Sequence, residues 1–192
     1  MQIPTHRQIL AHLGSARDQW GPSPPRDVVP EPAGPDRESV WSYPRPPLVR
    51  ELDAHVVVRW GATVVAETRR ALEIVETAGA PVPYIAPEDV AIELLRETGP
   101  ITLCEWKGAA VHYDLVQGAA RLPAAAFCYP DPLTDLERGY ERVAGWFGFY
   151  PAKLDCFINQ ELAVAQPGGL YAGWMTSRIA GPVKGAPGTG HW

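Results

Sequence analysis

The segment from Leu103 to Asp114 concentrates side chains that could do chemistry. It runs LCEWKGAAVHYD and holds a thiol, two carboxylates, an amine, an imidazole and two aromatic rings. Carboxylates and imidazoles transfer protons, and an amine binds anions or stabilises developing negative charge. Acids and bases mixed beside aromatic rings are a common arrangement for moving pKa values toward neutrality. The segment therefore predicts an acid–base site or an anion site.

The elements that carry these groups have the composition of β-strands. Because successive strand residues point to opposite faces, Glu105 and Lys107 are expected to share one face. We expect a hairpin around Gly108-Ala109, which would bring this pair near His112 and Asp114 on the next strand. The alternative is a surface hairpin with a solvated row of charges, which is the usual state of these residue types.

Two functions are compatible with this cluster. The first is a small-molecule enzyme that uses acid–base chemistry without a redox cofactor, as a lyase, cyclase or hydrolase. Its candidate catalytic residues are Glu105 or His112 as general base and Lys107 as anion holder. The candidate substrate-binding residues supply charge or aromatic walls, and they are Arg69, Trp41, Tyr84, Trp106, Tyr113, Trp174 and Lys184.

The second function is a non-catalytic module that binds a nucleotide or another aromatic anion. Cations would hold its charge and tryptophans would stack on its ring. No GxSxG or Cys–His nucleophile signature occurs, which favours this alternative. A third possibility is an interaction role in which the Pro-rich N-terminal arm contacts a partner.

Composition narrows the class of protein. The 192 residues, with 46% hydrophobic and 20% charged, predict one globular domain with appendages. We assign residues 1–38 to an N-terminal helix and Pro-rich arm, and 39–192 to a single mainly β domain that includes a wrapping C-terminal tail. The formal net charge of −5 argues against a nucleic-acid partner. A small molecule is the expected partner, and a homo-oligomer stays open.

Cysteine and histidine usage adds expectations about compartment and metals. Cys104, Cys128 and Cys156 form no CxxC pair and follow no secretory segment, so we expect reduced thiols in the cytoplasm. No apolar run approaches the ~20 residues needed to span a bilayer, so no membrane partner is expected. The histidines are scattered and the cysteines lack zinc spacing, so neither a metal nor a cofactor is expected.

Local signals predict a mainly β fold with a few short helices. Thr5 and Gln8 have the spacing of a capping box ahead of a short N-terminal helix. β-branched runs on both sides of Gly61-Ala62 predict a hairpin. Two further helices are expected, one opening at Pro87 and ending before Gly99, and one over 134–147.

An ordered set of motifs from Ser39 onward resembles a widespread bacterial family known as domain of unknown function 427. The motifs include Arg69-Arg70-Ala71, Pro87-Glu88-Asp89-Val90, Cys104-Glu105-Trp106-Lys107-Gly108, Tyr129-Pro130-Asp131-Pro132 and the tail from Pro167 to Trp192. The resemblance implies a compact, mainly antiparallel β domain that is barrel-like or tent-like, with one or two helices. A nucleotidyltransferase-like label is sometimes attached to the family, but this chain lacks paired aspartates in a Gly-Ser context.

Two positions differ from the pattern that the resemblance implies. Relatives tend to carry Ser-His-Pro-Pro where this chain has Ala78-Gly79-Ala80-Pro81, and a tyrosine where it has His112. If both positions face one pocket, the imidazole has moved within it. Such a move would alter acid–base chemistry or ligand choice.

Overall fold

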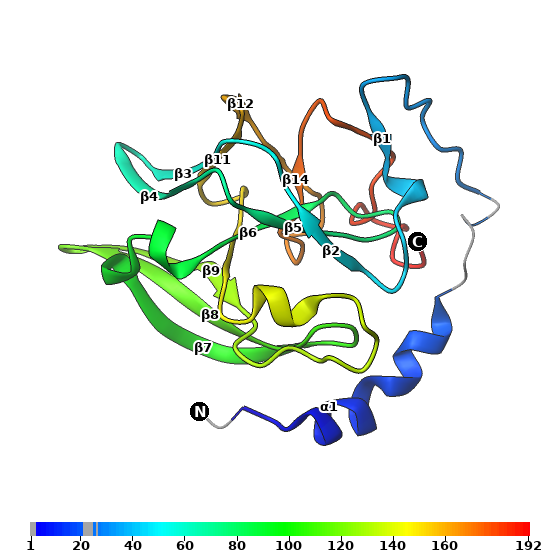
Figure 1. Cartoon of the computed structure of the whole chain (residues 1–192), viewed down its shortest axis with the longest axis horizontal. Helices are drawn as coiled ribbons and strands as arrows, with labels where there is room; N and C mark the ends of the chain where they lie inside the picture. The colour runs from blue at the N-terminus through cyan, green and yellow to red at the C-terminus, as the bar shows by residue number, and fades with distance from the viewer. Residues whose placement is uncertain (1–2, 21–24, 26) are drawn as a thin grey trace.

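The structure, a computed structural model, describes residues 3–20, 25 and 27–192. Part of the Pro-rich arm, at 21–24 and 26, lies outside the described residues, as do residues 1–2. The fold is mainly β, as predicted. A seven-stranded antiparallel sheet with the order β2-β5-β6-β10-β9-β8-β7 packs on a four-stranded sheet with the order β12-β11-β3-β4 (Figure 1). Within the described residues neither sheet closes into a barrel.

The strands of the larger sheet are β2 (Leu48–Glu51), β5 (Leu72–Val75), β6 (Val82–Ile85), β7 (Leu95–Cys104), β8 (Gly108–Gln117), β9 (Ala120–Cys128) and β10 (Phe147–Phe149). Those of the smaller sheet are β3 (Val56–Trp60), β4 (Thr63–Thr68), β11 (Asp155–Ile158) and β12 (Glu161–Leu162). Two-residue strands pair β1 (Glu38–Ser39) with β15 (Ile179–Ala180), and β13 (Val164–Ala165) with β14 (Trp174–Met175).

The main core lies between the two sheets. Strand alternation places Val111 and Leu115 of β8 in this core, where they join Val56 and Val58 of β3. The other face of the larger sheet carries a second apolar cluster that contains Tyr84, Trp106, Phe127 and Tyr129. This second face is the one that bears the candidate site.

Helical structure is scarcer than predicted. The helix α1 (His6–Leu13) is confirmed, together with its Thr5–Gln8 capping box. The described residues otherwise hold only short 3-10 helices: η1 (Gly14–Gln19), η2 (Val40–Ser42), η3 (Pro87–Asp89), η4 (Ile92–Leu94) and η5 (Tyr140–Val143).

The two further predicted helices are therefore wrong, for different reasons. After η4 the chain becomes β7, because pairing with β8 outweighs the local helical preference. Between 134 and 147, Gly139 has φ +78° and Gly145 has φ +72°, and this left-handed backbone breaks a right-handed helix. Phe147 then starts β10.

The two ends of the chain attach to the body in different ways. Helix α1 lies below β7 and β8 in Figure 1, and its buried Ile9 packs against Ala109 and Leu133. The C-terminal tail forms backbone hydrogen bonds with the body, from Trp174 N to Pro81 O at 2.9 Å and from Lys184 N to Ala78 O at 2.8 Å.

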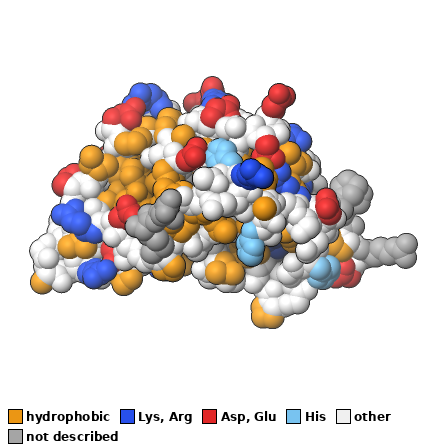
Figure 2. Space-filling view, turned by 90° about the horizontal axis from the view of Figure 1, so that it is seen from below, with side chains coloured by type: hydrophobic (Ala, Val, Ile, Leu, Met, Phe, Trp, Pro, Cys, Tyr) orange, Lys and Arg blue, Asp and Glu red, His pale blue; other side chains and the backbone are white. Residues whose placement is uncertain are grey.

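The surface seen from below the sheet is mixed in character. Figure 2 shows hydrophobic side chains on the left part of this face, with acidic and basic groups interspersed. No helix in the described part of the chain has the length and apolar character needed to cross a bilayer.

Candidate ligand-binding cavity

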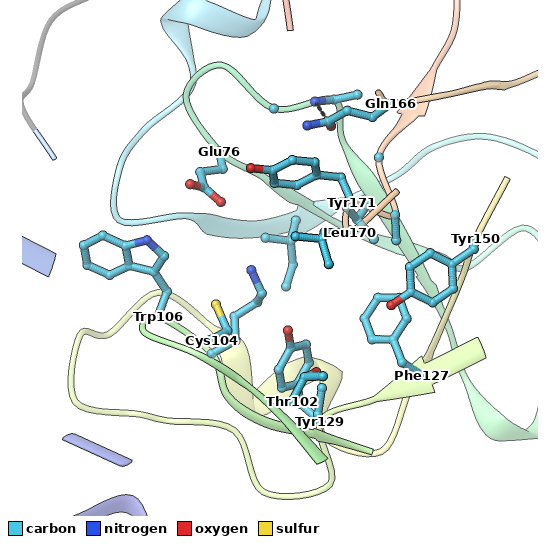
Figure 3. A pocket seen from close by; sticks show the side chains of 18 of the residues that line it. Glu76, Thr102, Cys104, Trp106, Phe127, Tyr129, Tyr150, Gln166, Leu170 and Tyr171 are labelled. Carbon is cyan, nitrogen blue, oxygen red and sulfur yellow. Dashed lines mark hydrogen bonds between the residues drawn. The ribbon is translucent and has the colours of Figure 1, made fainter. Parts of the chain in front are cut away.

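A cavity of about 560 Å³ opens on the face of the larger sheet that points away from the main core. Its floor includes Ile74, Val82, Tyr84, Thr102, Cys104, Lys107, Ala110, His112, Phe127 and Tyr129. Gln166, Leu170, Tyr171, Ala172 and Lys184 of the tail cover it, and Trp20, Trp106 and Tyr150 complete its walls. Figure 3 shows Trp106 and Cys104 across the cavity from Phe127 and Tyr150, with Tyr171 and Leu170 above Tyr129 and Thr102.

The aromatic floor follows from strand register. Gly148 of β10 pairs with Tyr84 on one side and with Phe127 on the other. The Phe127 ring lies over Gly148 so closely that a Cβ atom there would be 2.5 Å from its Cζ. Tyr84 meets Phe127 edge to face at a centroid distance of 5.8 Å. The glycine thus lets two aromatic rings pack side by side on the sheet.

The turn that carries the reactive segment differs from the predicted hairpin. Cys104 pairs with Gly108, so the chain reverses over Glu105–Lys107 and not at Gly108-Ala109. Gly108 closes this turn with φ +98°, a backbone conformation that favours glycine. Because a turn does not alternate as a strand does, Glu105 and Lys107 do not form the predicted row beside His112 and Asp114.

Two cations of the cavity, Lys107 and Lys153, have no ionic partner among the described residues, but Lys153 donates to Pro123 O at 2.8 Å and to Ala124 O at 3.0 Å, whereas Lys107 donates to no described protein group. Within the described residues no carboxylate lies within 4 Å of its Nζ, whereas Lys184 pairs with Glu76 at 2.8 Å. The Lys107 Nζ lies 5.9 Å from the centroid of the Tyr129 ring. Burial works against its charge, but the acidic groups around it, Cys104 first, then Tyr129 and Tyr84, and the more distant Glu76 carboxylate, raise the pKa of Lys107 well above its usual value. The side chain is therefore an ammonium ion.

Four phenol groups line the same cavity as this ammonium ion. Tyr84, Tyr129, Tyr150 and Tyr171 line the cavity, and burial raises the pKa of each hydroxyl above the usual value. Among the described residues none of these hydroxyls hydrogen-bonds to a protein group, in contrast to Tyr140, which donates to Pro47 O at 2.7 Å. They remain protonated and available as hydrogen-bond donors.

A second set of charges lies under the tail and is compensated. Glu76 accepts a hydrogen bond from Lys184 Nζ at 2.8 Å and lies 3.4 Å from Arg45 Nε. Burial works against the Glu76 carboxylate, but Lys184, Lys107 and Arg45 outweigh it and hold its pKa below the usual value. Gln166 fixes the tail nearby by donating to Lys184 O at 3.0 Å and accepting from Ala80 N at 2.8 Å.

His112 lines the cavity away from the turn. Its Nε2 lies 2.8 Å from Thr102 Oγ1, and burial, reinforced by Lys153, lowers the pKa of the imidazole. His112 follows Gly108 by four steps along the strand at about 3.3 Å each, so the backbone positions of the two residues are roughly 13 Å apart. Gly79 lines the same cavity, so the two positions singled out from the sequence resemblance face one site.

The other carboxylates of the segment lie apart from this imidazole. Glu105 accepts from Trp20 Nε1 at 3.2 Å, and the buried Asp114 accepts from Ala124 N at 2.8 Å and pairs with Arg121. Glu105 and His112 line one cavity with Lys107, but Asp114 does not, so the predicted row of four ionisable side chains is not formed. Among the described residues, no group of three His, Cys, Asp or Glu side chains is placed to hold a metal ion.

The structure divides the predicted site residues into two sets. Those that line the cavity are Glu105, Lys107, His112, Tyr84, Trp106 and Lys184. Those that do not are Arg69, Trp41, Tyr113 and Trp174.

Each residue of the second set has a local reason for its place. Arg69 is exposed beyond the end of β4. Trp41 donates to Pro182 O at 3.0 Å, which secures the tail. Tyr113 packs on the main core because it alternates with His112, and Trp174 is fully buried there with its Nε1 donating to Phe149 O at 3.0 Å.

Several lining residues were missed by the sequence reasoning. Trp20, Glu76, Tyr150 and Tyr171 are far from the reactive segment in sequence, and although Glu76 and Tyr171 lie in motifs that carry the family resemblance, those motifs gave them no role in a site. Trp20 was assigned to the N-terminal arm. Only the packing of both chain ends against the larger sheet brings these side chains to the cavity.

The fold and cavity define a mainly antiparallel β protein with an aromatic, cationic cavity beside its larger sheet. Residues 48–160, more than half of the chain, match the model of a family described as "Domain of unknown function (DUF427)". The chain belongs to this family, and the resemblance stated from its motifs is confirmed. The comparison with curated proteins found no match. Trp20 and the tail residues over the cavity lie outside the matched range.

Proposed function

We propose that this chain binds a small organic anion with an aromatic or apolar body. The observation that carries the proposal is the Lys107 ammonium ion, which faces an aromatic cavity without a carboxylate partner in the described residues. The Glu76 carboxylate acts on this charge only from beyond 4 Å and already pairs with Lys184 at 2.8 Å, and a charge removed from water without a counter-ion in contact is costly. A carboxylate or sulfonate on the ligand would supply the missing negative charge and would accept hydrogen bonds from the ammonium group.

The rest of the cavity suits the body of such a ligand. Its volume of about 560 Å³ is within the range of sites for drug-sized molecules. Rings from the floor and walls offer apolar surface, and the four phenol hydroxyls offer donors to further acceptor atoms. We also propose that this binding takes place in the cytoplasm, where thiols stay reduced, because the three cysteines are free thiols.

A matched pair of fluorescent probes tests the requirement for an anion. Anilinonaphthalene sulfonate carries a sulfonate on the same ring system as the uncharged N-phenylnaphthylamine. We expect the full-length chain to bind the sulfonate more tightly. Lys107→Met should weaken sulfonate binding by about tenfold, equivalent to ~1.4 kcal/mol, and leave the uncharged probe within twofold.

The control variant is Arg69→Met, which removes one positive charge from the exposed surface. It should leave both probes unchanged, because Arg69 does not line the cavity. Equal affinity of the Lys107→Met variant and the parent for the sulfonate would overturn the proposal.

Acid–base catalysis on the bound anion is a second candidate, and His112 favours it. Burial and Lys153 keep this imidazole neutral and so able to accept a proton, in the same cavity as the ammonium ion and the phenols. An α-proton of a keto acid could pass to the imidazole while a phenol donates a hydrogen bond to the enolate oxygen.

Phenylpyruvate in deuterated buffer is a suitable probe for this candidate. Its α-protons should exchange faster with the protein than in buffer alone, and the gain should disappear in His112→Gln and persist in Arg69→Met. Exchange at the buffer rate with the parent protein would leave binding as the proposed function and would remove the catalytic one.

A further inference from the structure

Trp20 forms one wall of the cavity, and contacts made by side chains hold this wall in place. Trp20 follows η1, outside the range that the family model matches. Its Nε1 donates to Glu105 Oε1 at 3.2 Å. The guanidinium of Arg45 and the Nζ of Lys184 lie over its ring, at 4.6 and 5.4 Å from the centroid. One indole therefore contacts the turn, the segment before β2 and the tail.

Arg17 ties the same segment to the reactive turn. Its Nε donates to Glu105 O at 2.7 Å, and its guanidinium pairs with Asp135 at 2.5 Å. Both Arg17 and Trp20 thus hold Glu105, two residues before Lys107. The position of this wall is coupled to the turn that carries the cavity ammonium ion.

These attachments are made by side chains alone. Within the described residues, no backbone hydrogen bond joins residues 3–20 to residue 25 or any residue after it. The tail over the same cavity forms several such bonds, including those of Trp174 N and Lys184 N. Local unfolding costs less free energy where fewer contacts must be broken. A segment held only by side chains therefore detaches at a lower free-energy cost than one held by backbone hydrogen bonds.

We propose that Trp20 is a movable wall of the ligand site, which governs how fast the organic anion enters and leaves. This inference rests on the proposed function. When the indole swings away, the bond to Glu105 breaks and the cavity opens beside Lys107. When it returns, Arg45 and Lys184 hold its ring and the ligand is enclosed.

Stopped-flow mixing with anilinonaphthalene sulfonate measures the rates. We expect Trp20→Ala to raise both the association and the dissociation rate constant at least fivefold. Trp20→Phe keeps a ring but loses the N–H donor, so its rates should lie between those of the parent and the alanine variant. Trp60→Ala, at the β3–β4 turn away from the cavity, is the matched control and should keep the parent rates.

Chemical labelling of Cys104 provides a measurement that does not need the probe to bind. Cys104 lines the cavity and is partly exposed, whereas Cys128 and Cys156 are buried. Dithiobis(nitrobenzoate) should modify one thiol at least fivefold faster in Trp20→Ala than in the parent. Cys104→Ser should abolish this fast phase.

The outcomes separate the two proposals. Equal labelling rates in the parent and in Trp20→Ala, with a fast phase that depends on Cys104, would show that Trp20 does not control access to the cavity and would overturn the inference. Sulfonate binding that does not depend on Lys107, together with accelerated labelling in Trp20→Ala, would sink the proposed function and support the movable wall.

Discussion

Lys184 Nζ lies 2.8 Å from Glu76 Oε1, and this contact joins the C-terminal tail to the segment that follows β5. Arg45, from the segment before β2, approaches the same carboxylate oxygen at 3.4 Å. Three stretches of chain that are distant in sequence therefore meet at one carboxylate. The roof of the cavity depends on this group, because Lys184 and Tyr171 belong to the same tail.

Replacement of Glu76 by glutamine should destabilise the protein by about 3 kcal/mol, because it leaves two enclosed cations without their anion. Urea denaturation of the full-length chain measures the loss. Glu51→Gln is the matched control, since Glu51 is 85% exposed in its side chain and its ion pair with Arg142 is at the surface. It should change stability by less than ~0.5 kcal/mol. Similar losses for the two variants would refute this role of Glu76.

The same carboxylate predicts the direction of acid sensitivity. The pKa of Glu76 lies below its ordinary value of 4.5 in the folded chain, so the folded state binds fewer protons than the unfolded state near that pH. Its stabilising contribution is thus present above about pH 4.5 and is lost as the pH falls through the folded pKa. Denaturation midpoints between pH 3 and 6 should fall more steeply for the parent than for Glu76→Gln. Parallel curves would contradict the prediction.

The packing of Phe127 on Gly148 predicts an effect on both stability and binding. A Cβ atom at position 148 would lie 2.5 Å from Phe127 Cζ, so Gly148→Ala must displace the ring. We expect a loss of about 1–3 kcal/mol, typical of overpacking, and weaker binding of both fluorescent probes. Gly190→Ala is the control, because its Cβ atom would meet open space. A Gly148→Ala variant with parental stability and probe affinity would show that the ring moves without cost.

Protonation of His112 should strengthen anion binding. Burial and Lys153 lower the pKa of this imidazole from its ordinary 6.5, so it is neutral at pH 7 in the free protein. A positive charge roughly 10 Å from the bound sulfonate is worth about 0.8 kcal/mol at an effective dielectric near 40, or about fourfold in affinity. Fluorescence titrations should show tighter sulfonate binding as the pH falls from 7.5 through the lowered pKa. His112→Gln should lack this rise, and a rise of equal size in that variant would assign it to another group.

The sequence predicted the class of fold and the location of the chemistry, because both depend on local patterns. Runs of β-branched residues and punctuation by Gly and Pro indicated antiparallel strands. The density of ionisable groups from Cys104 to His112 pointed to the turn that now borders the cavity. The capping box at Thr5 marked the one α-helix of the described residues. Spacing within a few residues was sufficient for each of these predictions.

The tertiary structure decided which side chains meet. Whether Glu105, His112 and Asp114 form one row depends on where the hairpin turns, and with the turn at Glu105–Lys107 the first two line the cavity while Asp114 pairs with Arg121 outside it. Trp174 and Trp41 were also predicted as walls of the site. Trp174 is instead buried in the main core, and Trp41 instead donates a hydrogen bond to the tail. Trp20 and Tyr171 reach the cavity from opposite ends of the chain, through packing that no local pattern encodes. Long-range packing sets the composition of a cavity, and residue spacing along one chain does not contain that information.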